Sequence, residues 1–314
     1  MMHVLITGIA GFTGIHLAQY VLTNGAQVVG FDQASNGLPP ALADKVSFNS
    51  GDIRSQAVLR RVLAETQPDI IYHLAGLLKS TDAKEFYEIN VLGTLALFEA
   101  IVELGLTPKV LVTSSSAVYG RGSGNRPLTE NFKLRPTTHY AVSKVAQEAI
   151  AYRYHLVYNI PIICTRAFNL IGPRQSPVLA CSAFARQIAL AERTKQIDTL
   201  VTGDLSPRRD FVDVRDAVRA YSLVVKSGKP GLAYNVCSQQ AISIKQCLDL
   251  LLEMTSIPLK TIVAPANLQV GDVPVQIGCA ARLVKHTGWR PEIPLEQSLA
   301  DLLDYWRQQV KSQP

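Results

Sequence analysis

The stretch HVLITGIAGFTGIHLAQYVL, from His3 to Leu22, decides the fold. Its apolar run Val4 to Ile6 is typical of a short, buried parallel strand. Gly8, Gly11 and Gly14 follow with the spacing G-x-x-G-x-x-G, and an amphipathic helix comes next. Glycine lets the backbone turn sharply and approach a phosphate, and the free N–H groups of a helix N-terminus attract a pyrophosphate. The stretch therefore predicts a dinucleotide site.

A carboxylate follows the glycines at a suitable distance. The second predicted strand, Gln27 to Phe31, ends in Asp32, which lies 21 residues beyond Gly11. This is close to the spacing of about 20 at which an acidic residue binds the adenosine ribose. Such a carboxylate repels a 2′-phosphate, so NAD(H) is the favoured cofactor and NADP(H) remains possible.

Strand and helix patterns alternate along the first half of the chain. We therefore expect an α/β fold, a Rossmann-type doubly wound parallel sheet with helices on both faces. The segment 34–45, rich in Gly, Pro, Asn and Ser, is expected to be a loop. The further predicted strands are 46–49, 69–74 and 109–113, and the predicted helices are 56–66, 86–104, 140 to about 158, and 295–309.

Composition excludes several classes of protein. The 314 residues are 47% hydrophobic and 18% charged, which is ordinary for a globular chain. No apolar run reaches the roughly 18 residues of a membrane span, and no basic residue precedes the N-terminal apolar stretch, so we expect neither a membrane protein nor an export signal. The five cysteines are scattered without a C-x-x-C pair, which predicts neither disulfides nor a metal site and suits the cytoplasm. The net charge of +6 comes without a Lys/Arg block, so we expect no nucleic-acid partner.

The predicted catalytic residues lie in the middle of the chain. Three serines, Ser114 to Ser116, stand at the end of the strand 109–113. Tyr140 and Lys144 are four residues apart and so share one face of a helix. A cation one turn away stabilises a phenolate and should lower the pKa of Tyr140, which makes it a usable acid or base. A serine hydroxyl at the strand end can bond the same substrate oxygen.

Some residues have two interpretations. Asp52 is interpreted as a contact to the adenine amine, with Ile53 covering the ring, and as a cap for the helix 56–66, and both can hold. His73 lies in an apolar run, where a histidine is more often a satisfied core residue than a catalytic base. Asn90 and Gly93 lie inside a predicted helix and should meet a packing or hydrogen-bonding need.

The order of these motifs resembles the extended short-chain dehydrogenases/reductases that act on sugar nucleotides, the NAD-dependent epimerase/dehydratase family. The resemblance covers nearly the whole chain. It rests on TGIAGFTG (7–14), GDI (51–53), HLAG (73–76), NVLGT (90–94), SSSAVYG (114–120), YAVSK (140–144), RAFNLIGPRQ (166–175), RRDFVDVRD (208–216) and YNV (234–236).

The resemblance assigns roles to these positions. It implies that Tyr140 is the acid/base, that Lys144 binds the nicotinamide ribose and tunes Tyr140, and that Ser115 is the catalytic Ser/Thr. The predicted cofactor-binding residues are Gly8, Gly11, Phe12, Thr13, Gly14, Asp32, Asp52, Ile53, Leu74, Ala75, Gly76, Tyr140 and Lys144.

The reaction follows from what the chain lacks. Members of the family that dehydrate the sugar generally carry an acid just after the catalytic Ser/Thr, where this chain has Ser116 and Ala117. Neither side chain transfers a proton usefully, so a 4,6-dehydratase is disfavoured. A reductase or a C4 epimerase remains, and a dinucleotide-sensing protein without catalysis is the alternative outside enzymes.

The C-terminal half resembles the subgroup of GDP-4-keto-6-deoxy-mannose reductases, through 169–188, 203–221, 228–238 and 272–291. This implies reduction of a nucleotide-linked 4-keto-6-deoxyhexose at C4 to GDP-D-rhamnose. Arg209 matches an arginine that contacts the diphosphate, and Arg186 is a second candidate. Gln269 stands where relatives often have arginine. The predicted substrate-binding residues are Ser116, Asn169, Arg186, Arg209 and Asp272.

The same resemblance predicts the organisation of the chain. Residues 1–168, completed by about 212–236, should bind the cofactor. A smaller substrate lobe should consist of 169–211 and 237–314, with the site in the cleft between them. The helices around 86–104 and 140–157 resemble the pair that forms a dimer in relatives, so a homodimer is expected.

Overall fold

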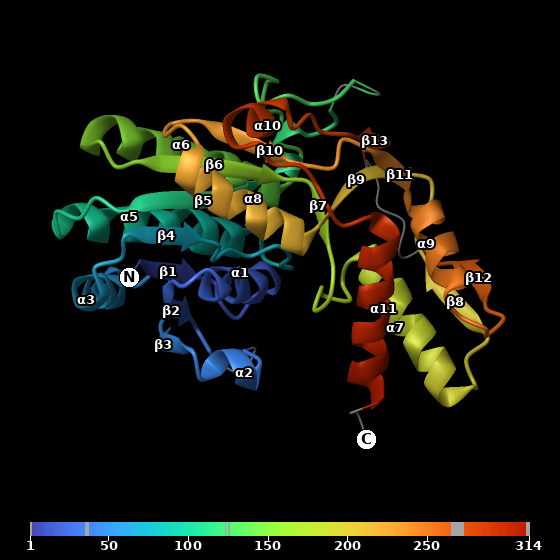
Figure 1. Cartoon of the computed structure of the whole chain (residues 1–314). Coiled ribbons are helices and arrows are strands. Elements are labelled where there is room, and N and C mark those ends of the chain that lie inside the picture. Colours follow the sequence, from blue (N-terminus) through green and yellow to red (C-terminus); the bar gives the residue numbers. More distant parts are fainter. Residues whose placement is uncertain (1, 35–37, 123, 125, 265–272, 312–314) are drawn as a thin grey trace.

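The computed structural model describes residues 2–34, 38–122, 124, 126–264 and 273–311. At its centre lies a seven-stranded sheet, all of whose neighbours pair in parallel (Figure 1). Across the sheet the order is β10-β6-β5-β4-β1-β2-β3, with bounds β1 His3–Thr7, β2 Gln27–Asp32, β3 Val46–Ser50, β4 Ile70–His73, β5 Lys109–Ser115, β6 Ile162–Ala167 and β10 Ala233–Val236. The doubly wound sheet that the sequence predicts is confirmed.

Helices cover both faces of this sheet. On one face α1 (Phe12–Thr23) packs beside α8 (Val214–Ser227), with α10 (Ala281–Thr287) and the short α2 (Pro40–Ala43) on the same core. The other face carries α3 (Gln56–Thr66), α5 (Gly93–Glu103) and α6 (His139–Tyr158). From β1 the strands are added first toward β3 and then, from β4 on, toward β10, so the strand order reverses between β1 and β4. Ligands bind at such a switch point, beyond the carboxyl ends of the strands.

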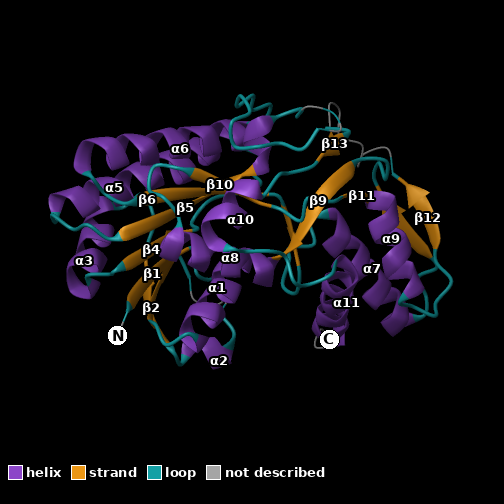
Figure 2. Ribbon diagram, turned by 45° about the horizontal axis from the view of Figure 1, so that its top comes forward, coloured by secondary structure: helices purple, strands orange, loops and turns teal. Residues whose placement is uncertain are grey.

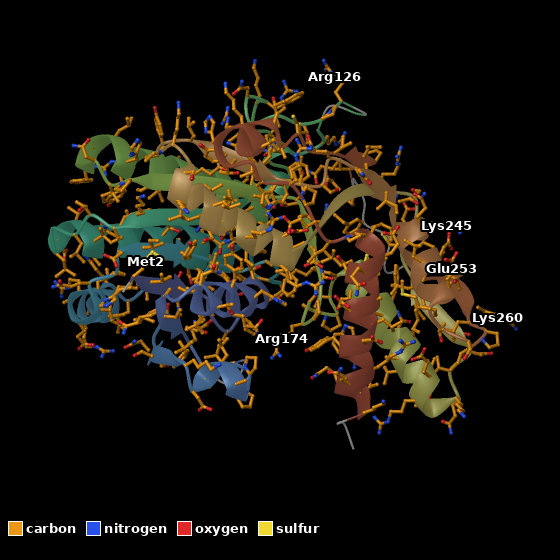
Figure 3. The ribbon with its side chains drawn as sticks, in the orientation of Figure 1. Met2, Arg126, Arg174, Lys245, Glu253 and Lys260 are labelled. Carbon is orange, nitrogen blue, oxygen red and sulfur yellow. The ribbon has the colours of Figure 1, made fainter. Side chains whose placement is uncertain are left out.

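A third apolar core lies beside the sheet and holds the second lobe together. It joins α7 (Ala180–Thr194), α9 (Ile244–Glu253) and α11 (Leu295–Lys311), which lie together on the right of Figures 1 and 2. Small strands complete this side: β7 (Asn169–Ile171), β11 (Ala241–Ser243) and β13 (Val275–Gln276) on β9 (Arg208–Asp213), and β8 (Thr199–Thr202) with β12 (Lys260–Val263). Charged side chains such as Lys245, Glu253 and Lys260 point outward from it (Figure 3).

Two predicted elements differ from the structure. The expected loop 34–45 contains α2, which begins at Pro40, where the fixed φ of proline suits the first helical turn. The expected single helix 86–104 consists of two kinds of helix. It follows the short α-helix α4 (Ala83–Glu85), is a π-helix over Phe86–Leu92 and is α-helical from Gly93 on. Such π-helical turns are frequent at functional sites.

Among the described residues, no helix is long and apolar enough to cross a membrane. The same part of the chain holds no group of three or more His, Cys, Asp or Glu side chains that could bind a metal ion. All five cysteines are free thiols, and four of them are buried.

Candidate active site

The glycine loop between β1 and α1 is built for close backbone contact. Gly8 has φ +75°, and a Cβ there would lie 2.7 Å from the backbone nitrogen of Ala75. A Cβ on Gly14 would lie 2.2 Å from the carbonyl oxygen of Gly8, so the first turn of α1 packs directly on the loop. Gly8, Gly11, Phe12, Thr13 and Gly14 all line the main cavity. The loop therefore fits a dinucleotide as the spacing predicts.

Asp32 supports this loop from the next strand. One carboxylate oxygen accepts the N–H of Ala10 at 2.9 Å, and the other accepts the N–H of Gln33 at 2.8 Å. The carboxylate thus fixes the glycine loop, and each oxygen keeps a further lone pair for a ribose hydroxyl. The ribose contact itself stays a prediction.

The helix-cap interpretation of Asp52 is wrong. Ser55 is the N-cap of α3, whereas the Asp52 carboxylate binds Arg54 at 2.6 Å, and the Arg54 guanidinium lowers its pKa. Ile53 is buried, and its side chain would meet a Cβ placed on Gly93. The Ile53 side chain is therefore a core contact, and its cover of the adenine ring stays a prediction.

Three predicted catalytic residues lie together at the carboxyl end of β5. Thr138 caps α6 by accepting the N–H of Ala141 at 3.1 Å, which places Tyr140 in the first turn of the helix. The Lys144 ammonium lies 5.9 Å from the centre of the Tyr140 ring and donates to the Thr113 carbonyl at 3.0 Å. The Ser115 side chain lowers the pKa of the Tyr140 hydroxyl, and all three residues line the cavity.

The pKa values of this group differ from the simple expectation. Burial raises the pKa of Tyr140, and the hydrogen bond with Ser115 opposes that rise. Burial also lowers the pKa of Lys144 to about 8, partly offset by the negative charge of Glu148. We expected Lys144 to lower the pKa of Tyr140, but in this structure the loss of solvent dominates for both residues. The Ser115 side chain is the neighbour that opposes the rise in the pKa of Tyr140.

Asn90, the buried polar residue of the π-helical segment, meets a hydrogen-bonding need. It is fully buried; its amide oxygen accepts the N–H of Leu77 at 2.7 Å, and its amide nitrogen donates to the Ser143 hydroxyl at 2.8 Å. It therefore joins the catalytic helix to the loop after β4. His73 is bonded by the hydroxyls of Thr7 and Thr94, and burial lowers its pKa to about 3, so it is the satisfied core residue that the sequence favours.

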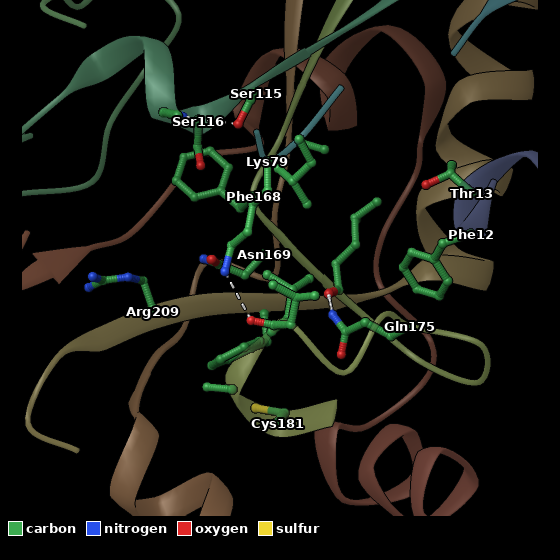
Figure 4. Close-up of a pocket in the computed structure, with 18 of the residues that line it drawn as sticks. Phe12, Thr13, Lys79, Ser115, Ser116, Phe168, Asn169, Gln175, Cys181 and Arg209 are labelled. Carbon is green, nitrogen blue, oxygen red and sulfur yellow. Dashed lines mark hydrogen bonds between the residues drawn. The ribbon is translucent and has the colours of Figure 1, made fainter. Parts of the chain in front are cut away.

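A cavity of about 1070 Å³ connects the glycine loop with the second lobe. It runs past Ser115 and Tyr140 to residues of the second lobe, and Figure 4 shows part of its wall. Leu74 and Gly76 line it, whereas Asp32, Asp52, Ile53 and Ala75 are not among its lining residues. Its second-lobe wall contains Asn169, Gln175, Pro177 to Cys181, Ala183, Phe184, Gln187, Val201 to Asp204, Pro207, Arg209, Phe211, Ile244 and Gln276.

The predicted substrate residues divide into two sets. Ser116, Asn169 and Arg209 line the cavity. The Asn169 amide donates to the Asp210 carbonyl at 3.0 Å, and the Arg209 guanidinium donates to the Val273 carbonyl at 2.5 Å. Both residues are thus anchored on backbone beside the space they face.

Of the other two predicted substrate residues, the structure places only Arg186. Arg186 is not among the lining residues, and its guanidinium lies 5.8 Å from the ring of Trp306 in α11. The cavity side of α7 presents Gln187 instead, because the packing of α7 on α11 fixes which face is turned inward. Asp272 lies outside the described residues, as does Gln269.

Sequence reasoning missed three polar residues of the wall. Lys79 donates across the cavity to the Val178 carbonyl at 3.1 Å (Figure 4), and its place in the loop after β4 was a usable signal. The Gln187 amide bonds the backbone of Val201, and Gln276 bonds Ser116. Nothing local in the sequence distinguishes these two glutamines.

Comparison with known proteins agrees with this geometry. Residues 4–237 match the family described as "NAD dependent epimerase/dehydratase family". The chain belongs to this family. It is an NAD(P)-dependent enzyme of the extended short-chain dehydrogenase/reductase type, as the motifs predict.

Its relatives include several activities. The chain is 32% identical to a GDP-6-deoxy-D-mannose reductase from Pseudomonas aeruginosa, covering 98% of each chain. It is also 32% identical to a UDP-glucose 4-epimerase from Mycolicibacterium smegmatis, covering 98% of this chain and 99% of the relative. A mouse dTDP-D-glucose 4,6-dehydratase is 27% identical over 97% of this chain and 88% of its own.

Solved structures have the same fold and carry either cofactor. RMD from Pseudomonas aeruginosa, complexed with NADPH, superposes with a TM-score of 0.87 at 31% identity, over 98% of this chain and 100% of that one. The UDP-glucose 4-epimerase of Thermus thermophilus, complexed with NAD, gives a TM-score of 0.86 at 28% identity, over 98% and 99%.

Proposed function

We propose that this enzyme uses NAD(P)H to reduce the C4 ketone of a nucleotide-linked 4-keto-6-deoxyhexose, with GDP-4-keto-6-deoxy-D-mannose as substrate and GDP-D-rhamnose as product. The observation that carries the proposal is the group Ser115, Tyr140 and Lys144, assembled in one cavity that Arg209 also lines. The similarity to a GDP-6-deoxy-D-mannose reductase over almost the whole chain supports the choice of substrate.

The chain fits the cofactor at three places. The glycine loop leaves no room for a Cβ at Gly8 or Gly14, which suits a pyrophosphate held by backbone N–H groups. Asp32 would bind the adenosine ribose and favours NAD(H), and Lys144 would bind the nicotinamide ribose. When bound, the nicotinamide supplies the hydride.

Tyr140 and its neighbours would handle the proton. Reduction of the ketone places a negative charge on the C4 oxygen, and the Tyr140 hydroxyl donates its proton there. The Ser115 hydroxyl donates a hydrogen bond to the same oxygen, and the buried ammonium of Lys144 stabilises the phenolate left behind. In a buried site these groups act without competition from water, which strengthens each interaction.

The second lobe would hold the nucleotide. Arg209 would pair with the diphosphate through charge-assisted hydrogen bonds. Asp204 lines the cavity, and one of its carboxylate oxygens accepts the N–H of Ser206 at 2.8 Å. A carboxylate only accepts hydrogen bonds, so it complements the adjacent N1–H and N2–H donors of guanine and is repelled by the two carbonyls of uracil. This favours a GDP-linked over a UDP-linked sugar.

Dehydration remains disfavoured. The positions after Ser115 hold Ser116 and Ala117, and the Ser116 hydroxyl is bonded to Gln276 at 3.2 Å. A C4 epimerase is the second candidate, because the chain is as similar to an epimerase as to the reductase and epimerases use the same three catalytic groups. A sensing protein without catalysis would have no use for the assembled group.

We also propose a homodimer in the cytoplasm. Four apolar side chains on one end of α6, Tyr152, Leu156, Val157 and Tyr158, are exposed. This helix lies along the outside of the molecule (Figure 2), where a second copy could cover it. The proposed cofactor domain is 1–168 with about 212–236, and the seven-stranded sheet supports it by using strands from both parts.

Cofactor consumption tests the function. Purified protein is mixed with NADH or NADPH and GDP-4-keto-6-deoxy-D-mannose made in situ, and the near-ultraviolet absorbance of the reduced cofactor is followed. Loss of absorbance together with a GDP-6-deoxyhexose product is the expected result. No loss, together with NAD released only on denaturation, would favour the epimerase.

A further inference from the structure

Gln276 joins the catalytic turn to the second lobe. It lies in β13, is 7% exposed and lines the cavity. Its amide nitrogen donates to the Ser116 carbonyl at 3.0 Å, and its amide oxygen accepts the Ser116 hydroxyl at 3.2 Å. One buried side chain therefore holds both the backbone and the side chain of Ser116.

The residue that Gln276 holds is the direct neighbour of Ser115. Ser115 caps the 3₁₀ turn Ser116–Tyr119 by accepting the N–H of Ala117 at 3.2 Å, and it lines the same cavity as Tyr140, whose pKa it lowers. Rotation of the peptide at Ser116 would move this cap and redirect the Ser115 hydroxyl. The Gln276 side-chain amide prevents that rotation, because two hydrogen bonds to Ser116 fix the orientation of its peptide, whereas a single bond would not.

The same strand also contacts the proposed diphosphate site. In the pairing of β13 with β9, Gln276 lies opposite Arg209. The Arg209 guanidinium donates to the carbonyl of Val273, three residues before Gln276. The short segment 273–276, which ends in β13, thus connects the arginine with the catalytic turn.

We propose that Gln276 is a positioning residue for Ser115: its two hydrogen bonds to Ser116 fix the hydroxyl that contacts Tyr140 and the substrate oxygen, and β13 links this alignment to the nucleotide at Arg209. The proposal rests on the proposed function for its substrate. The rival explanation is a purely structural glutamine that only satisfies the polar groups of a buried turn.

Gln276→Met separates the two explanations because methionine is close in length and makes neither hydrogen bond. Misalignment of a catalytic group should lower kcat about tenfold to a hundredfold, with the KM for NADH almost unchanged. In a Ser115→Ala enzyme the same substitution should cost little more, since the group it positions is gone. An equal loss in both backgrounds would show that Gln276 does not act through Ser115.

A titration without substrate keeps this test independent of the proposed reaction. Tyrosinate absorbance is followed against pH, with a Tyr140→Phe protein subtracted. Gln276→Met should move the Tyr140 titration to higher pH, because the Ser115 bond that opposes its rise is weakened. The matched control is Gln175→Met, another buried glutamine of the cavity wall, which bonds the Leu170 carbonyl instead and should leave the titration in place. An unchanged titration in Gln276→Met with a normal melting temperature would overturn the proposal, whereas failure to consume NADH would overturn only the proposed reaction.

Discussion

Burial decides the chemistry of single residues in this site. Lys144 is 5% exposed, and its ammonium has one carbonyl, that of Thr113, at 3.0 Å. An ammonium with so few partners loses most of its hydration, which is why its pKa falls to about 8. Tyr140 meets the opposite shift for the same reason. The site therefore holds two groups whose pKa values, nearly equal in water, are driven apart by burial.

Tyr140→Phe should remove the proton donor and keep the fold. We expect kcat to fall by about a hundredfold to ten-thousandfold, the usual contribution of a general acid. Tyr152→Phe is the matched control, since Tyr152 lies on the same helix α6 but is 54% exposed and outside the cavity lining. Turnover is measured with saturating cofactor. Full activity of Tyr140→Phe would show that Tyr140 is not the proton donor, and no turnover by the wild type would favour the sensing protein.

Lys144→Met should inactivate the enzyme and raise the free energy of unfolding of its folded chain. The pKa of Lys144 is lower in the folded chain, about 8, than in the unfolded chain. Between that value and the ordinary lysine pKa the unfolded state binds more protons, so this group makes stability rise with pH. Below about pH 8 the buried charge is a cost, and we expect the variant to be about 1–3 kcal/mol more stable there.

The pH dependence gives the check on that prediction. Urea unfolding of the cofactor-free proteins should show the advantage of Lys144→Met shrinking as pH rises from about 8 to about 10.4. An advantage that does not change with pH would point to packing rather than to charge.

At the scale of elements, the glycine loop depends on contacts that only glycine allows. Gly14 is helical and unstrained, yet its Cβ would lie 2.2 Å from the Gly8 carbonyl. The constraint is thus the packing of α1 on the loop before it, which the sequence spacing signals directly.

Gly14→Ala should therefore displace the loop and weaken cofactor binding. We expect at least about tenfold weaker binding of NADH by fluorescence titration, since several backbone contacts shift together. Binding of GDP by calorimetry is the internal control, because Arg209 and Asp204 lie in the second lobe. Loss of both ligands would indicate general unfolding.

How far the sequence predicts each element depends on how local its cause is. The strands and α3 follow from apolar periodicity, and α3 was predicted with its bounds, Gln56–Thr66. The π-helical segment 86–92 was not predicted, because it depends on hydrogen bonds from Asn90 to Leu77 and Ser143, which are distant in sequence. Gln276 was missed for the same reason, since its partner Ser116 is 160 residues away.

At the scale of the whole molecule, the site exists only where two parts of the chain meet. The catalytic group comes from the central sheet and α6, and the substrate wall comes from 167–211, 244 and 276. The sequence predicts which segments form each part. It does not predict how α7 is rotated about its axis, because that depends on the packing of α7 against α11. The predicted substrate residue Arg186 therefore lies on Trp306, and its neighbour Gln187 faces the cavity.

The proposed dimer makes the last prediction. Leu156 is 58% exposed in the middle of the apolar group on α6, so a second copy that covers this helix would bury it. Leu156→Lys would place an unpaired charge in that interface, which is costly, and we expect a monomer by light scattering at concentrations where the wild type is a dimer. Ile262→Lys is the control, because Ile262 is 54% exposed on β12 in the other lobe. We expect this variant to remain a dimer. A monomeric wild type, or two variants that dimerise equally well, would exclude α6 as the interface.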